Sequence, residues 1–192
     1  MDWNADSITK MVNEKKGFTF KRVTKRGKWV SSLAREAKKW GTVPGGSYHF
    51  PKWITAPTGS GKSTFVLNDL AKIAKERQKS ILFLSSRSAQ IIQQKRDKAD
   101  VSNVSLPSMD QLSNTDIIDN IFISTYNGWF SFKKDHCTEL SNVEFVIFDE
   151  AHYFLNDSSF NPFTFYILSN IIESFLSSVR IYLRPCPYNG VN

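Results

Sequence analysis

Residues 53–64 of this 192-residue chain read Trp53-Ile54-Thr55-Ala56-Pro57-Thr58-Gly59-Ser60-Gly61-Lys62-Ser63-Thr64. The apolar start of this stretch predicts a short strand, and the apolar residues at helical spacing over residues 62–77 predict a helix after it. Gly59 and Gly61 permit backbone torsions that a side chain would block, so successive N–H groups can turn inward around an anion. A strand, a glycine-rich loop and a helix N-terminus in this order predict a phosphate-binding loop.

The end of the loop adds the groups that a nucleoside triphosphate requires. Lys62 would place its ammonium on the β- and γ-phosphates, and Ser63 would offer a hydroxyl to Mg²⁺. We therefore expect ATP and Mg²⁺ as cofactors, with Lys62 also contributing to catalysis. The predicted nucleotide contacts are Thr58, Gly59, Ser60, Gly61, Lys62, Ser63 and Thr64.

A second motif, at residues 145–152, complements the loop. The continuous apolar run from Phe145 to Phe148 predicts a strand buried on both faces of a parallel sheet. That strand delivers Asp149 and Glu150 at its carboxyl end, where ligands bind in open α/β sheets. We expect Asp149 to hold Mg²⁺ and Glu150 to orient and deprotonate the attacking water. A chance glycine-rich turn and an unrelated acidic pair are disfavoured, because both motifs occur in this order with room for β-α units between them.

The two motifs together resemble those of superfamily 2 helicases and translocases. Ala56 replaces the usual first glycine, and the form Ala-x-Thr-Gly-x-Gly-Lys-Ser followed by Asp-Glu-Ala-His is similar to the DEAD/DEAH-box and type III restriction-subunit branch. The resemblance covers residues 50–190 and implies a single α/β RecA-like domain, with a mostly parallel sheet covered by helices on both faces. We expect strands at 81–84, 104–106, 121–124, 145–148 and 180–183, and helices at 62–77, 89–98 and 163–176.

Weaker landmarks of the family follow in the same order. The resemblance implies that Ser85, Ser86 and Arg87 after one strand, and Thr125 after a later one, touch a nucleic-acid backbone. An ordinary alternative stays open for both sites. The first group could be a solvated strand-to-helix turn, and Thr125 could cap the next helix.

Three departures from the family bear on activity. Arg184-Pro185-Cys186 stands where the family has the Ser-Ala-Thr triplet that couples hydrolysis to movement, and a proline there removes a backbone donor. The adenine-reading segment upstream of the loop is not recognisable. The sequence ends at Asn192, before the second RecA-like domain that completes the ATP site in family members, so we expect that domain to be encoded separately or to be missing.

Two functional hypotheses follow. The leading one is the ATP-binding motor half of a superfamily 2 DNA helicase or translocase, with nucleic acid as partner, DNA in preference to RNA. The contrasting one is a truncated, non-catalytic remnant that serves as a nucleotide- or nucleic-acid-binding module, or that assembles with a separately encoded second RecA-like domain.

The basic charge of the chain is concentrated at its N-terminus. Residues 1–40 hold eleven of the 25 Lys and Arg but four of the 18 Asp and Glu, which accounts for the whole net charge of +7. We expect residues 1–45 to be a basic extension with a linker and residues 46–192 to be the ATPase domain. The extension also carries interleaved aromatic residues, Phe18, Phe20, Trp29 and Trp40. Two interpretations stay open: a nucleic-acid-binding module, or a basic appendage whose aromatics pack on the ATPase domain.

Local patterns within the extension predict its elements. The alternation at residues 18–20 suggests a hairpin that turns near Arg26-Gly27 and returns at Val30. Ser31 or Ser32 would then cap a helix that runs to Trp40, followed by a linker at residues 41–47.

The remaining composition narrows the setting. Two cysteines without metal-like spacing suit a reducing cytoplasm, and no apolar run approaches the length of a membrane span. Four aromatic residues in and before the last predicted helix are expected to pack beneath the sheet rather than to stack on bases. They are Phe160, Phe163, Phe165 and Tyr166.

Overall fold

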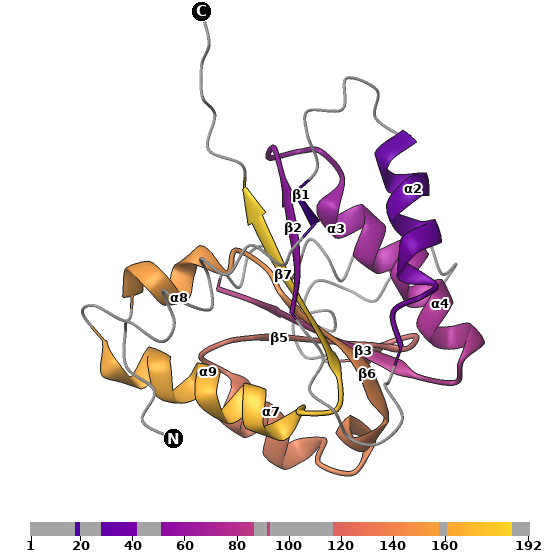
Figure 1. Ribbon diagram of the computed structural model, residues 1–192. Helices are drawn as coiled ribbons and strands as arrows, with labels where there is room; N and C mark the ends of the chain where they lie inside the picture. The colour runs from indigo at the N-terminus through magenta and orange to yellow at the C-terminus, as the bar shows by residue number, and fades with distance from the viewer. Residues whose placement is uncertain are drawn as a thin grey trace, which may run out of the picture.

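The computed structural model describes residues 18–19, 28–41, 51–86, 92, 117–157 and 161–185. These residues form a seven-stranded sheet in the order β1-β2-β7-β6-β3-β5-β4, with helices on both faces (Figure 1). Neighbouring strands pair in parallel except β4 and β5, which pair antiparallel. The predicted fold class is confirmed. The strands are β1 (Phe18–Thr19), β2 (Lys52–Ala56), β3 (Ser80–Ser85), β4 (Ile117–Ile118), β5 (Ile121–Thr125), β6 (Val143–Phe148) and β7 (Val179–Pro185).

The helices divide between the two faces (Figure 1). One face carries α2 (Lys28–Ala37) and a continuous helical stretch made of α3 (Lys62–Thr64), a π-helical segment (Phe65–Leu70) and α4 (Ala71–Glu76). The other carries α7 (Trp129–Asp135), α8 (His152–Asp157) and α9 (Pro162–Ser174), with a short 3₁₀ turn at Glu139–Asn142 between α7 and β6. No helix formed by the described residues is both long and apolar enough to cross a bilayer. The predicted helix at 89–98, apart from Ile92, and the predicted strand at 104–106 lie outside these residues.

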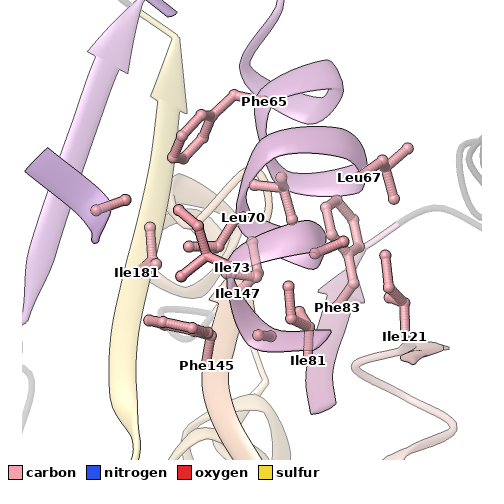
Figure 2. Packing of buried hydrophobic residues seen from close by; sticks show 14 of the residues in the cluster. Phe65, Leu67, Leu70, Ile73, Ile81, Phe83, Ile121, Phe145, Ile147 and Ile181 are labelled. Atoms are coloured by element: carbon pink, nitrogen blue, oxygen red, sulfur yellow. The ribbon is translucent and has the colours of Figure 1, made fainter. Parts of the chain in front are cut away.

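The central strands are apolar throughout because both of their faces are buried. In β6, Phe145 and Ile147 pack toward the α2–α4 face, while Val146 and Phe148 pack toward the α7–α9 face. Figure 2 shows the first of these cores, where Phe65 and Leu70 of the π-helical segment lie against the strands. This two-sided burial is the physical basis of the apolar run that precedes Asp149.

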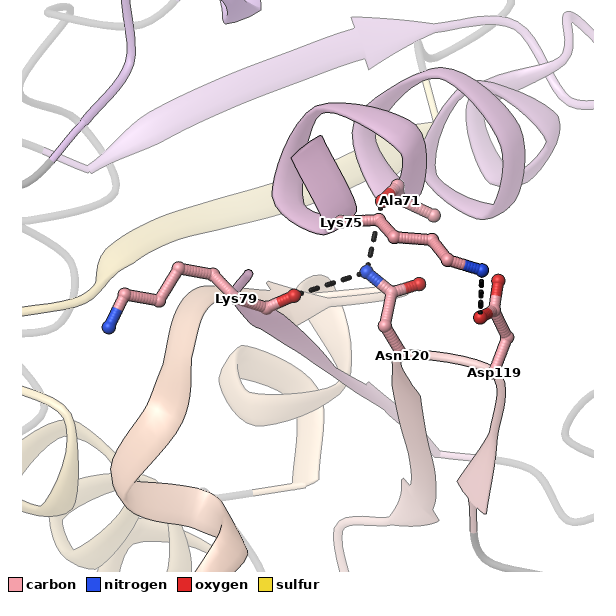
Figure 3. A network of polar contacts seen from close by, with 5 residues as sticks. All are labelled: Ala71, Lys75, Lys79, Asp119 and Asn120. Carbon is pink, nitrogen blue, oxygen red and sulfur yellow. Dashed lines mark hydrogen bonds and ion pairs between the residues drawn. The ribbon is translucent and has the colours of Figure 1, made fainter. Parts of the chain in front are cut away.

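A polar clamp ties the end of α4 to the turn between β4 and β5 (Figure 3). Lys75 Nζ lies 2.6 Å from Asp119 Oδ1. Asn120 Nδ2 donates to the carbonyl oxygens of Ala71 and Lys79, at 3.0 and 3.2 Å. The clamp fixes α4, the last part of the helical stretch after the glycine-rich loop, to the edge of the sheet formed by β5 and β4.

The predicted N-terminal hairpin is wrong. Phe18 in β1 pairs in parallel with Ile54 of β2, and Val30 lies in a helix that begins at Lys28. Ser31 and Ser32 therefore lie inside α2 and do not cap it. This segment forms a helix rather than a strand because helical spacing lets Leu33 and Ala37, four residues apart, both be buried in the core.

The segment from Val30 to Trp40 packs into the same core as the sheet. Trp40 is buried, edge-on to Phe65 at a centroid distance of 6.4 Å. Arg77 fixes the segment from outside, donating to the carbonyl oxygens of Trp40 at 2.5 Å and Lys38 at 2.6 Å, and to Glu144 Oε1 at 2.7 Å. For Trp40, the interpretation that the aromatics pack on the ATPase domain is therefore correct.

The prediction for the aromatic residues of α9 is wrong at two positions. Phe163 and Tyr166 are 52% and 57% exposed, whereas Phe165 is partly buried against the core. The helix turns a different side to the sheet, burying Ile167 and Ile171. Phe160 lies outside the described residues.

Candidate nucleotide site

The glycine-rich loop joins β2 to α3 at the carboxyl edge of the sheet. Gly59 and Gly61 have φ of +72° and +92°, in the left-handed region that a side chain disfavours. No heavy atom lies within 4 Å of a Cβ placed at either glycine, so backbone torsion rather than crowding requires glycine there. The helix then begins with a bond from Phe65 N to Gly61 O at 2.9 Å.

Lys62 lies folded over its own loop. Its Nζ donates to the carbonyl oxygens of Ala56 at 2.7 Å and Pro57 at 3.0 Å. These bonds hold the ammonium at the mouth of the loop. The side chain is long and only partly buried, so it can turn from the carbonyls toward an incoming anion.

The acidic pair sits where β6 ends. Asp149 is buried, and its main chain is anchored by a bond from its N to Leu84 O at 2.8 Å and by Tyr126 Oη, which donates to its O at 2.7 Å. Burial, together with the nearby Asp149 carboxylate, raises the pKa of Tyr126 well above its usual range, so the phenol remains a donor. The Asp149 carboxylate is thereby held at a fixed height above the sheet.

Glu150 adopts a left-handed backbone conformation, with φ of +52°. For a residue with a side chain this conformation costs about 1–2 kcal/mol, so its surroundings must compensate. Three bonds do so: Glu150 N donates to Asp149 Oδ1 at 3.1 Å, Tyr153 N donates to Glu150 O at 2.8 Å, and Ser86 Oγ donates to Glu150 Oε2 at 3.1 Å. The last bond aims the Glu150 carboxylate from a neighbouring strand.

A cleft of about 250 Å³ lies between the loop and the acidic pair. It brings together most of the predicted nucleotide and metal residues: Thr58, Gly59, Gly61, Lys62, Ser63, Thr64, Asp149 and Glu150. Ser60 does not line the cleft, and its Oγ is buried.

Leu183 and Pro185 also line the cleft and were missed by the sequence reasoning. They lie there because β7 pairs with β2, which sets Pro185 opposite Ala56 at the root of the loop. No local sequence motif indicates the spatial order β2-β7-β6, which produces this contact.

The comparisons with known proteins agree with this geometry. The family model of the DEAD/DEAH box helicases matches residues 46–183. The chain belongs to the DEAD/DEAH box helicase family. Among solved structures, the UvsW helicase from bacteriophage T4 matches with a TM-score of 0.50 at 14% identity, over 96% of this chain and 61% of the helicase chain. That similarity shows the fold, and no curated protein matches the sequence significantly.

The helicase family generally binds ATP with Mg²⁺, and the cleft has the donors for both. Mg²⁺ in phosphate sites takes one or two protein oxygens and completes its shell with phosphate and water. The Ser63 hydroxyl and the Asp149 carboxylate, both lining the cleft, meet that requirement. Among the described residues, no group of three or more His, Cys, Asp or Glu side chains forms a separate metal cluster.

The residues predicted to touch nucleic acid are largely engaged within this helicase domain. Ser85 is fully buried in β3, and Ser86 Oγ donates to Glu150 Oε2. Thr125 Oγ1 accepts from Gly128 N at 3.0 Å in the turn before α7, whereas the N-cap of that helix is Gly128 and no side chain caps it. Arg87 lies outside the described residues.

Proposed function

We propose that this helicase-family domain binds ATP with Mg²⁺ in the cleft between the loop and Asp149, as the motor half of a helicase or translocase. One observation carries the proposal. The loop of residues 58–64 and the Asp149-Glu150 pair, far apart in sequence, line a single cleft. The loop supplies positive and N–H groups, and the opposite wall supplies carboxylates, which is the division that a metal-bound triphosphate requires.

Each side chain has a distinct role in the proposal. Lys62 exchanges the carbonyl oxygens of Ala56 and Pro57 for the β- and γ-phosphates. Ser63 and Asp149 hold Mg²⁺, which neutralises charge on the phosphates when bound. Glu150, aimed by Ser86, orients a water and accepts its proton.

Nucleic acid is the proposed partner, DNA in preference to RNA. The basic residues of the N-terminal segment supply a grip that does not depend on base sequence. A second RecA-like domain, on whichever chain carries it, is proposed to close the cleft and add arginines that stabilise the γ-phosphate. In related systems such an arginine is worth about 10³ to 10⁵ in rate, so hydrolysis by these 192 residues should be slow.

A non-catalytic binding module is the second candidate, and the end of β7 favours it. Arg184 and Pro185 continue the pairing of β7 with β2 at the position of the family's coupling triplet. Pro185 has no N–H to donate, so this edge lacks the coupling chemistry of the Ser-Ala-Thr triplet. Cys186 lies outside the described residues. Binding of ATP without measurable turnover, even with nucleic acid and a second RecA-like domain added, would favour this candidate.

Titration calorimetry of Lys62→Ala tests the proposal. ATP affinity should fall strongly in the variant, because a charged donor to the phosphates is lost, while thermal unfolding should stay close to the wild type. Lys72→Ala is the matched control, because Lys72 is an exposed lysine on α4 that does not line the cleft. Equal ATP affinity in the wild type and Lys62→Ala would refute the proposed site.

A further inference from the structure

The peptide group between Asp149 and Glu150 is held at both of its polar atoms. Its oxygen, Asp149 O, accepts from Tyr126 Oη at 2.7 Å. Its N–H, on Glu150, donates to Asp149 Oδ1 at 3.1 Å. Because a peptide group is planar and rigid, its oxygen and its N–H turn together. The orientation of this single peptide group therefore sets the position of the Asp149 carboxylate.

The same peptide group sets the backbone conformation of Glu150. The φ of Glu150 is +52°, in the left-handed region that a side chain disfavours. Since φ measures rotation about the bond that joins this peptide group to the Glu150 Cα, a turn of the peptide plane would relieve the strain. The same turn would move the Glu150 N–H away from Asp149 Oδ1. The hydrogen bond from Tyr126 opposes this turn.

Tyr126 is itself held rigidly. Its side chain is 1% exposed, and its backbone N donates to Ser85 O at 3.0 Å. Its ring stacks with Phe148 and Tyr153 at centroid distances of 6.4 and 5.6 Å, and meets Phe154 edge-on at 4.4 Å. These contacts fix the hydroxyl in place, so it cannot follow the carbonyl if the peptide turns.

A second tyrosine in the same apolar cluster lacks this bond. The ring of Tyr182 stacks with Phe148 at a centroid distance of 4.6 Å, and its side chain is 5% exposed. Among the residues that the structure describes, its hydroxyl has no hydrogen-bond partner. Both tyrosines thus pack against the residue before Asp149, but only Tyr126 bonds to the main chain of the acidic pair.

We propose that Tyr126 is a positioning residue for the Mg²⁺ site. Its hydroxyl holds the peptide group between Asp149 and Glu150 in the orientation that presents the Asp149 carboxylate to the cleft. Tyr126 does not line the cleft, so it acts through Asp149 rather than by touching nucleotide or metal. The inference rests on the proposed function, in which Asp149 holds Mg²⁺.

The test is titration calorimetry of ATP, with Mg²⁺ and with EDTA. The ratio of the two affinities, here called the magnesium gain, measures how much the metal contributes to binding. Tyr126→Phe keeps the ring and should lower the magnesium gain by about two- to tenfold, the worth of one hydrogen bond. ATP affinity in EDTA should not change, which also verifies that the variant is folded. Tyr182→Phe should keep the whole magnesium gain.

A double-mutant cycle with Asp149→Asn tests the route of the effect. If Tyr126 acts only through the Asp149 carboxylate, its hydroxyl has nothing left to position in Asp149→Asn. The variant Tyr126→Phe/Asp149→Asn should therefore have the same magnesium gain as Asp149→Asn alone. Additive losses would mean that the hydroxyl acts elsewhere, and the inference would be wrong.

The remaining outcomes separate the inference from the proposed function. If the wild type and Asp149→Asn have equal magnesium gains, Asp149 does not hold the metal, and both are overturned. If Asp149→Asn loses the gain but Tyr126→Phe keeps it, the inference alone is overturned. If Tyr126→Phe lowers ATP affinity equally with Mg²⁺ and with EDTA, the hydroxyl is only structural, and the inference is again wrong.

Discussion

The nucleotide cleft and the neighbouring edge formed by β3 and β5 differ in what their side chains do. In the cleft, the torsions of Gly59 and Gly61 shape the loop, and the end of β6 sets the position of Asp149. At the neighbouring edge, the hydroxyls of Ser86 and Thr125 make bonds inside the domain. A motif fixed by backbone geometry therefore keeps its place, whereas the role of a hydroxyl depends on the partner that the fold brings to it.

The largest effect is expected for Glu150→Gln, which tests the cleft side of this comparison. Loss of a general base lowers a rate by about 10²- to 10⁴-fold. ATP affinity should stay near that of the wild type, because the amide keeps the size of the side chain. Single-turnover hydrolysis with protein in excess measures even a slow rate, and Glu173→Gln on the exposed side of α9 is the control. Equal single-turnover rates in the wild type and Glu150→Gln would show that another group accepts the proton.

Much of the fold and the cleft could be predicted because local chemistry dictates them. The strand before the loop and the strand before Asp149 are both where the apolar runs indicate. The glycines must occupy the left-handed positions, because other residues are strained there. Motif residues set by such constraints do not depend on distant parts of the chain.

The features that the sequence did not predict depend on packing between segments that are distant in the sequence. Leu183 and Pro185 line the cleft because β7, the last strand in the sequence, lies between β2 and β6 in the sheet. The exposure of Tyr166 depends on the side of α9 that faces the sheet, and in an apolar helix the sequence marks that side weakly. Residues 28–30, predicted as the end of a hairpin strand, belong to the first turn of α2, because that helix packs Leu33 into the core.

A smaller effect is expected for Ser86→Ala, which separates the two roles offered for this residue. If Ser86 positions Glu150, losing the 3.1 Å bond should lower the single-turnover rate by about two- to tenfold, the worth of one hydrogen bond. ATP and oligonucleotide affinities should not change. Ser86→Thr, which keeps the hydroxyl, should restore the rate.

The opposite pattern is equally informative for Ser86. A loss of oligonucleotide affinity with an unchanged rate would mean that the hydroxyl contacts nucleic acid, as the family resemblance implies. In that case the bond to Glu150 would be incidental, and the contrast between the cleft and its neighbouring edge would be weaker than proposed.

The smallest effect concerns Tyr126, which joins the two regions. It follows β5, and its Oη donates to the main chain of Asp149 at 2.7 Å. Tyr126→Phe should lower the free energy of unfolding by about 1 kcal/mol, because it leaves a buried carbonyl without this donor. Tyr182→Phe is the matched control. That hydroxyl is buried and has no hydrogen-bond partner among the residues that the structure describes, so its removal should be neutral or stabilising.

The pH dependence of stability should also differ between the wild type and Tyr126→Phe. Burial raises the pKa of Tyr126 well above the ordinary value of 10.0 in the folded state, whereas the unfolded chain ionises near that value. The stabilisation is therefore complete below pH 10 and declines above it, as the unfolded tyrosine loses its proton and the folded one does not. Chemical denaturation between pH 8 and pH 11 should show a steeper loss of stability in the wild type than in Tyr126→Phe. Parallel curves would mean that the phenol is not held protonated against Asp149, and that β5 and the acidic pair are joined by packing alone.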